Sequence, residues 1–291
     1  PNHKFTVDAN EILEDPDIDI ISIATFDNFH AKQVIKAIEN GKHVFVEKPI
    51  CLYEKELIEI VNALNKNPKC KLSSNFVLRK SPQFKKIENY IQKGDFGELY
   101  YIEGDYNYGR VNKLNNGWRG EIPFYSVMHG GGIHIIDLLT WISKKKVIEV
   151  IGIGNKIVSK NSNFKDLDMI TSILRFENNV IGKVTANYGS VTPHFHKLSL
   201  YGTNATFINN YDSGIIYRER ENGNNREEFK HIFENSKKSN VLTSFILSIL
   251  ENKPPDVSIK EVINVMSISL AIQKSLSTKN WEKVKYLNIN N

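Results

Sequence analysis

The sequence is poor in cysteine and has no long apolar run. Its 291 residues include two cysteines, Cys51 and Cys70, which are too few and too far apart for a zinc cluster or a redox pair. We therefore expect no metal site and a reducing, cytoplasmic setting. No run of about 18 apolar residues could span a bilayer, and no secretory signal opens the chain, so we also expect no membrane partner.

The sequence also lacks a strong excess of charge of either sign. Lysine and arginine number 38 against 33 aspartates and glutamates, a net charge of +5. The basic residues are not interleaved with aromatic side chains as nucleic-acid binding requires, so no nucleic-acid partner is expected. A solvated surface or attraction for an anionic substrate explains the charge better. The contents of 41% hydrophobic and 24% charged residues exclude a disordered chain.

Buried strands alternate with amphipathic helices in the first part of the chain. Residues 18–24 form a short β-branched run that is typical of a strand covered on both faces. Helical spacing follows at residues 31–38 and 57–64, and shorter strands are expected at 44–46 and 71–76. This order predicts a parallel sheet with right-handed crossovers.

Long strands dominate the rest. After a helix over residues 82–94, residues 99–108 alternate like a half-buried strand, and Glu177-Asn178-Asn179 is typical of a hairpin turn. We predict a large open, mainly antiparallel sheet with helices on one face, an α+β layer. The other strands are expected at 148–158, 169–176, 180–188, 197–201 and 215–218, and late helices at 241–252 and 258–277.

Residues just after the parallel strands are the first candidates for a site, because ligands of such sheets bind beyond the carboxyl ends of the strands. Thr25, Phe26 and His30 follow the first strand, and Glu47-Lys48-Pro49 follows the second. A lysine there can bind a ribose or substrate oxygen and stabilise negative charge. An ordinary surface lysine is the alternative.

A glycine-rich segment leads into a helix with a histidine in its first turn. Residues 130–132 are glycines that allow close approach of the backbone, and His134 and Asp137 share one helical face. Because histidine titrates near neutral pH, His134 suits proton removal from an alcohol. A structural histidine beside a tight packing turn is the alternative.

Together these segments resemble the Gfo/Idh/MocA family of NAD(P)-dependent oxidoreductases, named for glucose-fructose oxidoreductase and inositol dehydrogenase. The resemblance extends along almost the whole chain. The segments that carry it are Ala24-Thr25 with His30, Gly41-Lys42-His43-Val44 before Glu47-Lys48-Pro49, Gly94-Asp95-Phe96-Gly97-Glu98, Trp118-Arg119, the glycines with His134-Ile135-Ile136-Asp137, Tyr201-Gly202-Thr203, and a helix ending near Ser275.

The resemblance implies a partial Rossmann domain over residues 1–78 that holds NAD or NADP, and a substrate-binding and oligomerisation domain over 79–291. The implied reaction is hydride transfer between the nicotinamide and a secondary alcohol or ketone of a sugar, nucleotide sugar or cyclitol. A homodimer or homotetramer through the second sheet is also implied. A non-catalytic nucleotide- or sugar-binding or regulatory remnant of the fold is the alternative.

The resemblance also assigns roles to single residues. Lys48 and His134 are the implied catalytic pair, in which His134 takes the hydroxyl proton and Lys48 steadies the oxygen. The implied cofactor-binding residues are Thr25, Phe26, His30, Glu47, Lys48 and Pro49. The implied substrate-binding residues are Asn75, Trp118, Arg119, His129 and Asp137.

Three departures from the family pattern affect the site. Gly130 stands where many members have an aspartate four residues before the histidine, which leaves Asp137 as a partial substitute. Phe26 and Asp27 replace a usual proline and a common asparagine. No G-x-G-x-x-G occurs; we expect that phosphate-binding turn to precede Pro1, and the alternative is a remnant that cannot hold a dinucleotide.

Overall fold

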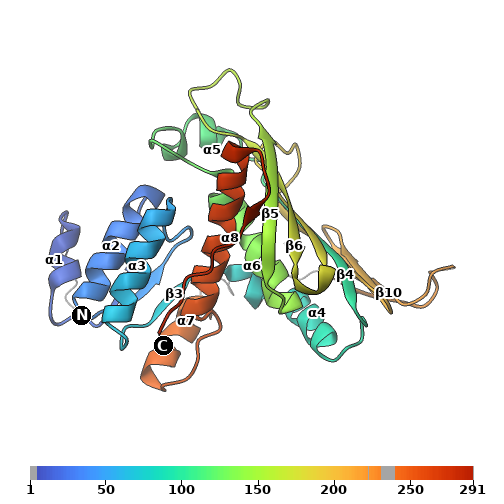
Figure 1. Cartoon of the computed structure of the whole chain (residues 1–291), viewed down its shortest axis with the longest axis horizontal. Coiled ribbons are helices and arrows are strands. Elements are labelled where there is room, and N and C mark those ends of the chain that lie inside the picture. The colour runs from blue at the N-terminus through green and yellow to red at the C-terminus, as the bar shows by residue number, and fades with distance from the viewer. Residues whose placement is uncertain (1–4, 222, 231–239, 291) are drawn as a thin grey trace.

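The computed structural model describes residues 5–221, 223–230 and 240–290. Two sheets lie on either side of the long helix α8 (Ile259–Thr278), as Figure 1 shows. The smaller sheet has the strand order β1-β2-β3, and the larger one has nine strands in the order β11-β10-β9-β8-β4-β7-β6-β5-β12. The predicted combination of a small parallel sheet and a large, mostly antiparallel one is confirmed.

The small sheet is built from two strand-helix-strand units. Its strands β1 (Ile20–Ile23), β2 (His43–Val46) and β3 (Leu72–Ser74) run parallel. Helices α2 (Asp27–Glu39) and α3 (Glu54–Lys66) connect them and bury their apolar faces in the core. All three strands therefore end at the same edge of the sheet.

One helix of this part was not predicted. The short helix α1 (Ala9–Glu14) begins after Asp8, whose side chain accepts a hydrogen bond from the backbone N–H of Asn10. Leu13 is its one buried residue, so α1 has no apolar stripe that sequence periodicity could reveal.

The large sheet is antiparallel except between β4 and β7, which run parallel. Its predicted hairpin is present: the turn Glu177–Asn179 joins β6 to β7, with Asn178 and Asn179 in the left-handed region at φ 59° and 60°. Strands β9, β11 and β12 were not predicted. The strands are β4 (Leu99–Asn107), β5 (Val147–Asn155), β6 (Met169–Phe176), β7 (Ile181–Asn187), β8 (Phe195–Gly202), β9 (Thr206–Asn209), β10 (Ser213–Tyr217), β11 (Arg226–Lys230) and β12 (Glu282–Lys283).

Helices cover one face of the large sheet. The contact is close where the backbone N–H of Gly152 on β5 donates to the Ser275 hydroxyl of α8 at 2.8 Å. A short π-helix, η3 (Met128–Gly132), runs directly into α6 and contains the glycine run. The remaining helical segments are α4 (Pro82–Gln92), α5 (Asn112–Asn115), α6 (Ile133–Ser143), α7 (Asn240–Leu250), η1 (Val77–Lys80) and η2 (Trp118–Gly120).

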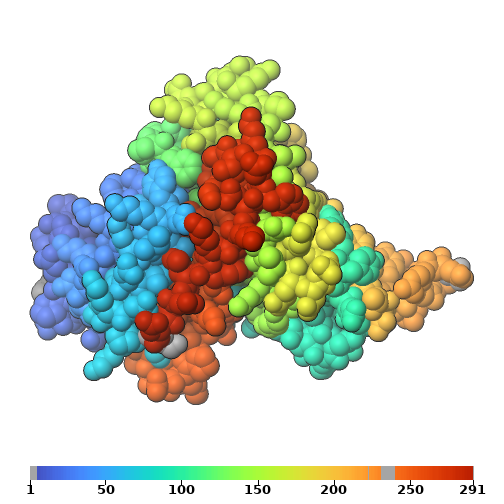
Figure 2. All heavy atoms as spheres, in the orientation of Figure 1, coloured from blue at the N-terminus to red at the C-terminus, as the bar shows by residue number. Residues whose placement is uncertain are grey.

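The C-terminal segment returns to the small sheet. After β12, Lys285 forms an ion pair with Glu54 of α3 at 3.4 Å, and the backbone N–H of Asn290 donates to Asn65. Figure 2 shows this red segment between the blue N-terminal part and the yellow-green large sheet. The boundary between residues 78 and 79 stays a prediction, since the end of the chain contacts both parts. Within the described ranges, no helix is both long and apolar enough to cross a membrane.

A buried arginine joins three elements at the start of the second part. Arg79 of η1 is 3% exposed, and its Nη2 donates to Asp137 of α6 at 2.6 Å. Its Nη1 donates to Glu261 of α8 at 2.7 Å and to the Asp256 carbonyl oxygen at 2.9 Å. Burial lowers the pKa of Arg79, but attraction to Asp137 and Glu261 outweighs it and raises that pKa above its ordinary value.

We expect Arg79→Met to lower the free energy of unfolding by about 3–5 kcal/mol, because the substitution leaves the Asp137 carboxylate buried without its partner. Urea denaturation followed by circular dichroism measures this. The control is Lys253→Met, which breaks a pair with Glu251 in which the lysine side chain is 72% exposed, and whose expected cost is below about 1 kcal/mol. Equal losses in the two variants would contradict the structural role of Arg79.

Candidate active site

The segments that follow the three parallel strands are tied to one another. The buried ring of His30 lies with Nδ1 2.6 Å from the Pro49 carbonyl oxygen and Nε2 3.1 Å from that of Thr25. The Asn75 side chain donates to Glu47 at 2.7 Å. These bonds tie together the segments that follow β1, β2 and β3. The His30 ring has a structural role at this edge of the sheet.

Lys48 connects this edge to the glycine-rich segment. Its Nζ donates to the carbonyl oxygen of Gly130 at 2.7 Å, across 82 positions of sequence. Burial lowers the pKa of Lys48 below its ordinary value, while the negative charges of Glu47 and Asp27 oppose that shift. The ammonium is therefore fixed at the junction of the two sheets.

His134, in the first turn of α6, lies beside Lys48. Its side chain is 7% exposed, and its ring stacks on Tyr106 with centroids 6.0 Å apart. Burial, and then the charge of Lys48, place the pKa of His134 far below its ordinary value. Its Nδ1 is buried without a hydrogen-bond partner in the part of the chain that is described. At neutral pH the ring is an uncharged imidazole that can accept a proton.

Both side chains line one cavity of about 510 Å³. Glu47 and Asn75 form its polar side next to them, so four of the predicted site residues meet there. The other wall was missed, because His194 precedes β8 and His196 lies at its start, before the strand that the sequence predicts at residues 197–201. Its aromatic and basic members are Tyr106, Arg110, His194, Phe195, His196 and Tyr211.

Four of the five predicted substrate-binding residues do not line this cavity, and two of these four are fully buried in other contacts. Asp137 is fully buried in its pair with Arg79, because the helix turns that side chain toward η1. His129 is also fully buried, and its Nδ1 lies 2.7 Å from the hydroxyl of Ser269. Asp137 therefore does not replace the missing carboxylate beside His134, contrary to expectation.

Trp118 and Arg119 lie between the small sheet and the tyrosines behind the glycine run. The Trp118 ring stacks on Phe26 at 4.8 Å and 11°, so the residue that replaces the usual proline contacts the second part of the chain. The Nε of Arg119 donates to the hydroxyl of Tyr125 at 3.1 Å. Tyr125 is buried and was missed. Asp27, singled out in the sequence only as a departure from the family pattern, is 7% exposed in the first turn of α2.

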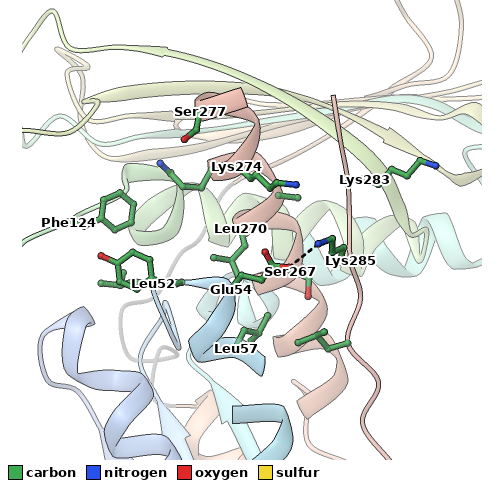
Figure 3. A pocket seen from close by; sticks show the side chains of 14 residues that line it. Leu52, Glu54, Leu57, Phe124, Ser267, Leu270, Lys274, Ser277, Lys283 and Lys285 are labelled. Atoms are coloured by element: carbon green, nitrogen blue, oxygen red, sulfur yellow. Dashed lines mark hydrogen bonds and ion pairs between the residues drawn. The ribbon is translucent and has the colours of Figure 1, made fainter. Parts of the chain in front are cut away.

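A second cavity, of about 320 Å³, lies between α3, α8 and the C-terminal segment (Figure 3). Leu52 and Phe124 line it on the side that faces Leu270 of α8. The rings of Tyr53 and Phe124 stack at 5.7 Å. Helix α8 therefore supports both the segment that follows Lys48 and the one that leads into η3. In the described residues no group of three His, Cys, Asp or Glu side chains could hold a metal ion.

Comparison with known proteins places this site in a family. Residues 1–76 match the family model described as "Oxidoreductase family, NAD-binding Rossmann fold", and residues 89–285 match "Oxidoreductase family, C-terminal alpha/beta domain". These are the two domains of an oxidoreductase that uses a nicotinamide cofactor. The chain belongs to the Gfo/Idh/MocA family.

Two relatives are named as inositol dehydrogenases, and a similar solved structure is named as a levoglucosan dehydrogenase. The myo-inositol 2-dehydrogenase of Thermotoga maritima is 22% identical over 97% of this chain and 84% of its own length. The scyllo-inositol 2-dehydrogenase (NAD(+)) of Bacillus subtilis is 27% identical over 70% of this chain and 59% of its own. A solved levoglucosan dehydrogenase, in complex with NADH and L-sorbose, superposes with a TM-score of 0.85 at 21% identity, over 97% of this chain and 84% of that one. The predicted family, dehydrogenase class and nicotinamide cofactor are confirmed.

The burial of His129 predicts a pH dependence of stability. Burial lowers the pKa of His129 to about 3, whereas an unfolded histidine titrates near 6.5. Between these values the unfolded chain binds a proton that the folded chain does not, so the free energy of unfolding falls as the pH falls, by up to about 1.4 kcal/mol per pH unit. We expect His129→Asn, which can keep the bond to Ser269, to make this slope shallower by about that amount.

Urea denaturation at pH 4, 5 and 6 measures the two slopes. His134 contributes a dependence of the same sign, and it is present in both proteins, so the difference between the slopes isolates His129. Identical slopes would mean that His129 takes up its proton in the folded state.

Proposed function

We propose that this protein catalyses hydride transfer between NAD or NADP and a secondary alcohol or ketone of a sugar, nucleotide sugar or cyclitol. The observation that carries the proposal is the placement of Lys48 and His134 side by side in one cavity, next to the carboxyl ends of the parallel strands. The names of the inositol and levoglucosan dehydrogenases among its relatives support the substrate class.

His134 and Lys48 have different roles at the substrate oxygen. Neutral His134 accepts the hydroxyl proton, and the Lys48 ammonium stabilises the negative charge that develops on the oxygen. Bound NAD(P)⁺ supplies the hydride acceptor. In the reducing direction the protonated histidine returns the proton to the oxygen. Because burial keeps His134 uncharged, the base is available without prior loss of a proton.

The residues present fit the nicotinamide end of the cofactor. Thr25 and Lys48 follow directly on β1 and β2, at the edge where such ligands bind. The Asn28 side-chain oxygen, in the first turn of α2, is buried without a hydrogen-bond partner among the described residues. A buried acceptor of this kind suits an amide donor. Thr25, Glu47 and Lys48 are the residues that we assign to that end.

The cavity wall suits a polyol with an apolar ring face. The Phe195 and Tyr211 rings lie 4.4 Å apart and offer an aromatic surface for the carbon face of a sugar. Asn75, held by Glu47, offers polar atoms for hydroxyl groups. A non-catalytic binding protein would need the wall but not the paired lysine and histidine.

Turnover with NAD⁺ or NADP⁺ and a panel of inositols and sugars, followed by absorbance at 340 nm, tests the roles. We expect His134→Asn and Lys48→Met each to lower kcat by about 10²–10⁴-fold, because each removes a group that acts on the reacting oxygen. Lys55→Met, at an 86% exposed side chain of α3, is the control and leaves turnover unchanged. Full activity in both site variants would refute the assigned pair, and wild-type binding without turnover would favour the non-catalytic alternative.

We further propose that the open face of the large sheet joins two or four copies of the chain. This face carries exposed isoleucines, among them Ile153, Ile173 and Ile181. Its charges are balanced within the face, since Lys183 bridges Glu103 at 2.9 Å and Asp105 at 3.2 Å. Apolar residues beside internally paired charges are typical of a surface that another subunit covers.

Sedimentation velocity measures this assembly. We expect the double variant Ile173→Lys and Ile181→Lys to shift the protein to monomers, because the new charges would be buried without partners. Ile157→Lys, at an exposed position in the turn after β5, is the matched control and keeps the assembly. A wild-type protein that sediments as a monomer up to high micromolar concentration would exclude the proposed interface.

A further inference from the structure

The glycine run leaves no room for side chains on its inner side. A Cβ atom built on Gly130 would lie 2.1 Å from the Tyr125 hydroxyl, and one on Gly131 would lie 2.6 Å from the Tyr106 ring. Distances this short cannot be accommodated without displacing the rings. Tyr125 therefore occupies the space that a side chain at position 130 would fill, directly behind the carbonyl group that binds Lys48.

We propose that Tyr125 is a positioning residue of the catalytic centre: its hydroxyl takes the place of a side chain at position 130 and fixes the carbonyl oxygen to which Lys48 donates. The inference rests on the proposed function for its catalytic meaning. Its structural part concerns the geometry of Lys48 alone and can be measured separately.

The Tyr125 hydroxyl is itself held from two sides. It lies 2.9 Å from the Tyr188 hydroxyl and accepts a hydrogen bond from Arg119 Nε at 3.1 Å. The backbone of this residue is fixed as well, because its N–H donates to Asp166 at 2.9 Å. The ring is 1% exposed, so it cannot swing into solvent. A hydroxyl with these partners is a defined point against which Gly130 packs.

The Tyr125 hydroxyl lies where many family members have an aspartate side chain, and this difference also affects the charge of the catalytic centre. Tyr125 stays neutral, since burial raises its pKa to about 12. Lys48 and His134 therefore have no anion at position 130. The carboxylates that act on Lys48 are those of Glu47, after β2, and Asp27, in the first turn of α2. The position of Lys48 then depends on a carbonyl group instead of an ion pair within η3.

Tyr125→Phe tests the proposal, because it keeps the ring and removes the hydroxyl. The rate at which acetic anhydride acetylates Lys48 is measured over a range of pH by peptide mass spectrometry. This rate depends on how firmly the Lys48 amine is held, and its measurement needs no substrate. We expect Lys48 to be acetylated about threefold faster in the variant, as its bond to Gly130 loosens, and kcat to fall about fivefold with KM unchanged. Tyr90→Phe removes a hydroxyl of α4 that donates to Glu227, away from the cavity, and is the control.

The two measurements separate the two proposals. Unchanged acetylation of Lys48 in Tyr125→Phe overturns the positioning role, whatever the activity. A wild-type protein without turnover on any alcohol of the panel overturns the proposed function, while the acetylation rates still decide the role of Tyr125. A rise in KM with kcat unchanged would also contradict it, since that pattern belongs to a residue that contacts substrate.

A double-mutant cycle tests the exclusion of a side chain at position 130 without any activity. Gly130→Ala alone is expected to lower the thermal midpoint strongly, because its methyl group meets the Tyr125 hydroxyl. In a Tyr125→Ala background the same change is expected to cost far less, since the space has been vacated. Additive losses would show that the two positions are not coupled and would refute the proposed replacement.

Discussion

The buried ion pair between Arg79 and Asp137 constrains the rest of this structure. A buried guanidinium keeps its charge and is costly without anionic partners. The Arg79 side chain of η1 is 3% exposed and is paired with Asp137 of α6 and Glu261 of α8. The pair fixes the rotation of α6 about its axis. Since His134 lies one turn before Asp137 on the same helix, the ion pair that removes Asp137 from the cavity also directs His134 toward it.

Burial then sets the chemistry of the two catalytic candidates. It lowers the pKa of both Lys48 and His134, and the like charges they would carry add to the shift at His134. The negative charges of Glu47 and Asp27 favour the charged form of Lys48. Lys48 is therefore protonated while His134 is neutral. One cavity is thus lined by an ammonium and a neutral imidazole, the two states that the proposed alcohol oxidation requires.

Much of this could be predicted where a residue's position follows from local pattern. Lys48 follows a strand, and His134 lies in the first turn of a helix after glycines, so strand order and helical spacing place both. The direction of Asp137 could not be predicted, because it depends on Arg79, 58 positions away in the chain. Tyr125 was missed for a related reason. The sequence does not show which side chain occupies the space beside Gly130, so the need for glycine at this position could not be explained from it. The two-residue strand β12 has no period of its own, and its pairing with β5 is a tertiary contact.

The tyrosine behind Gly130 and the aspartate at position 27 both affect the charge around Lys48. A carboxylate within η3 would lie next to the carbonyl group that binds Lys48, in a buried place already crowded by Tyr125 and Tyr188. At the start of α2 the Asp27 carboxylate instead faces the positive end of a helix dipole, which favours its charged form. Burial raises its pKa, and the charges of Lys48 and Arg119 act against that rise. The negative charge that accompanies Lys48 is thereby supplied by the nucleotide-binding part of the chain, and the second part contributes neutral hydroxyl and carbonyl groups.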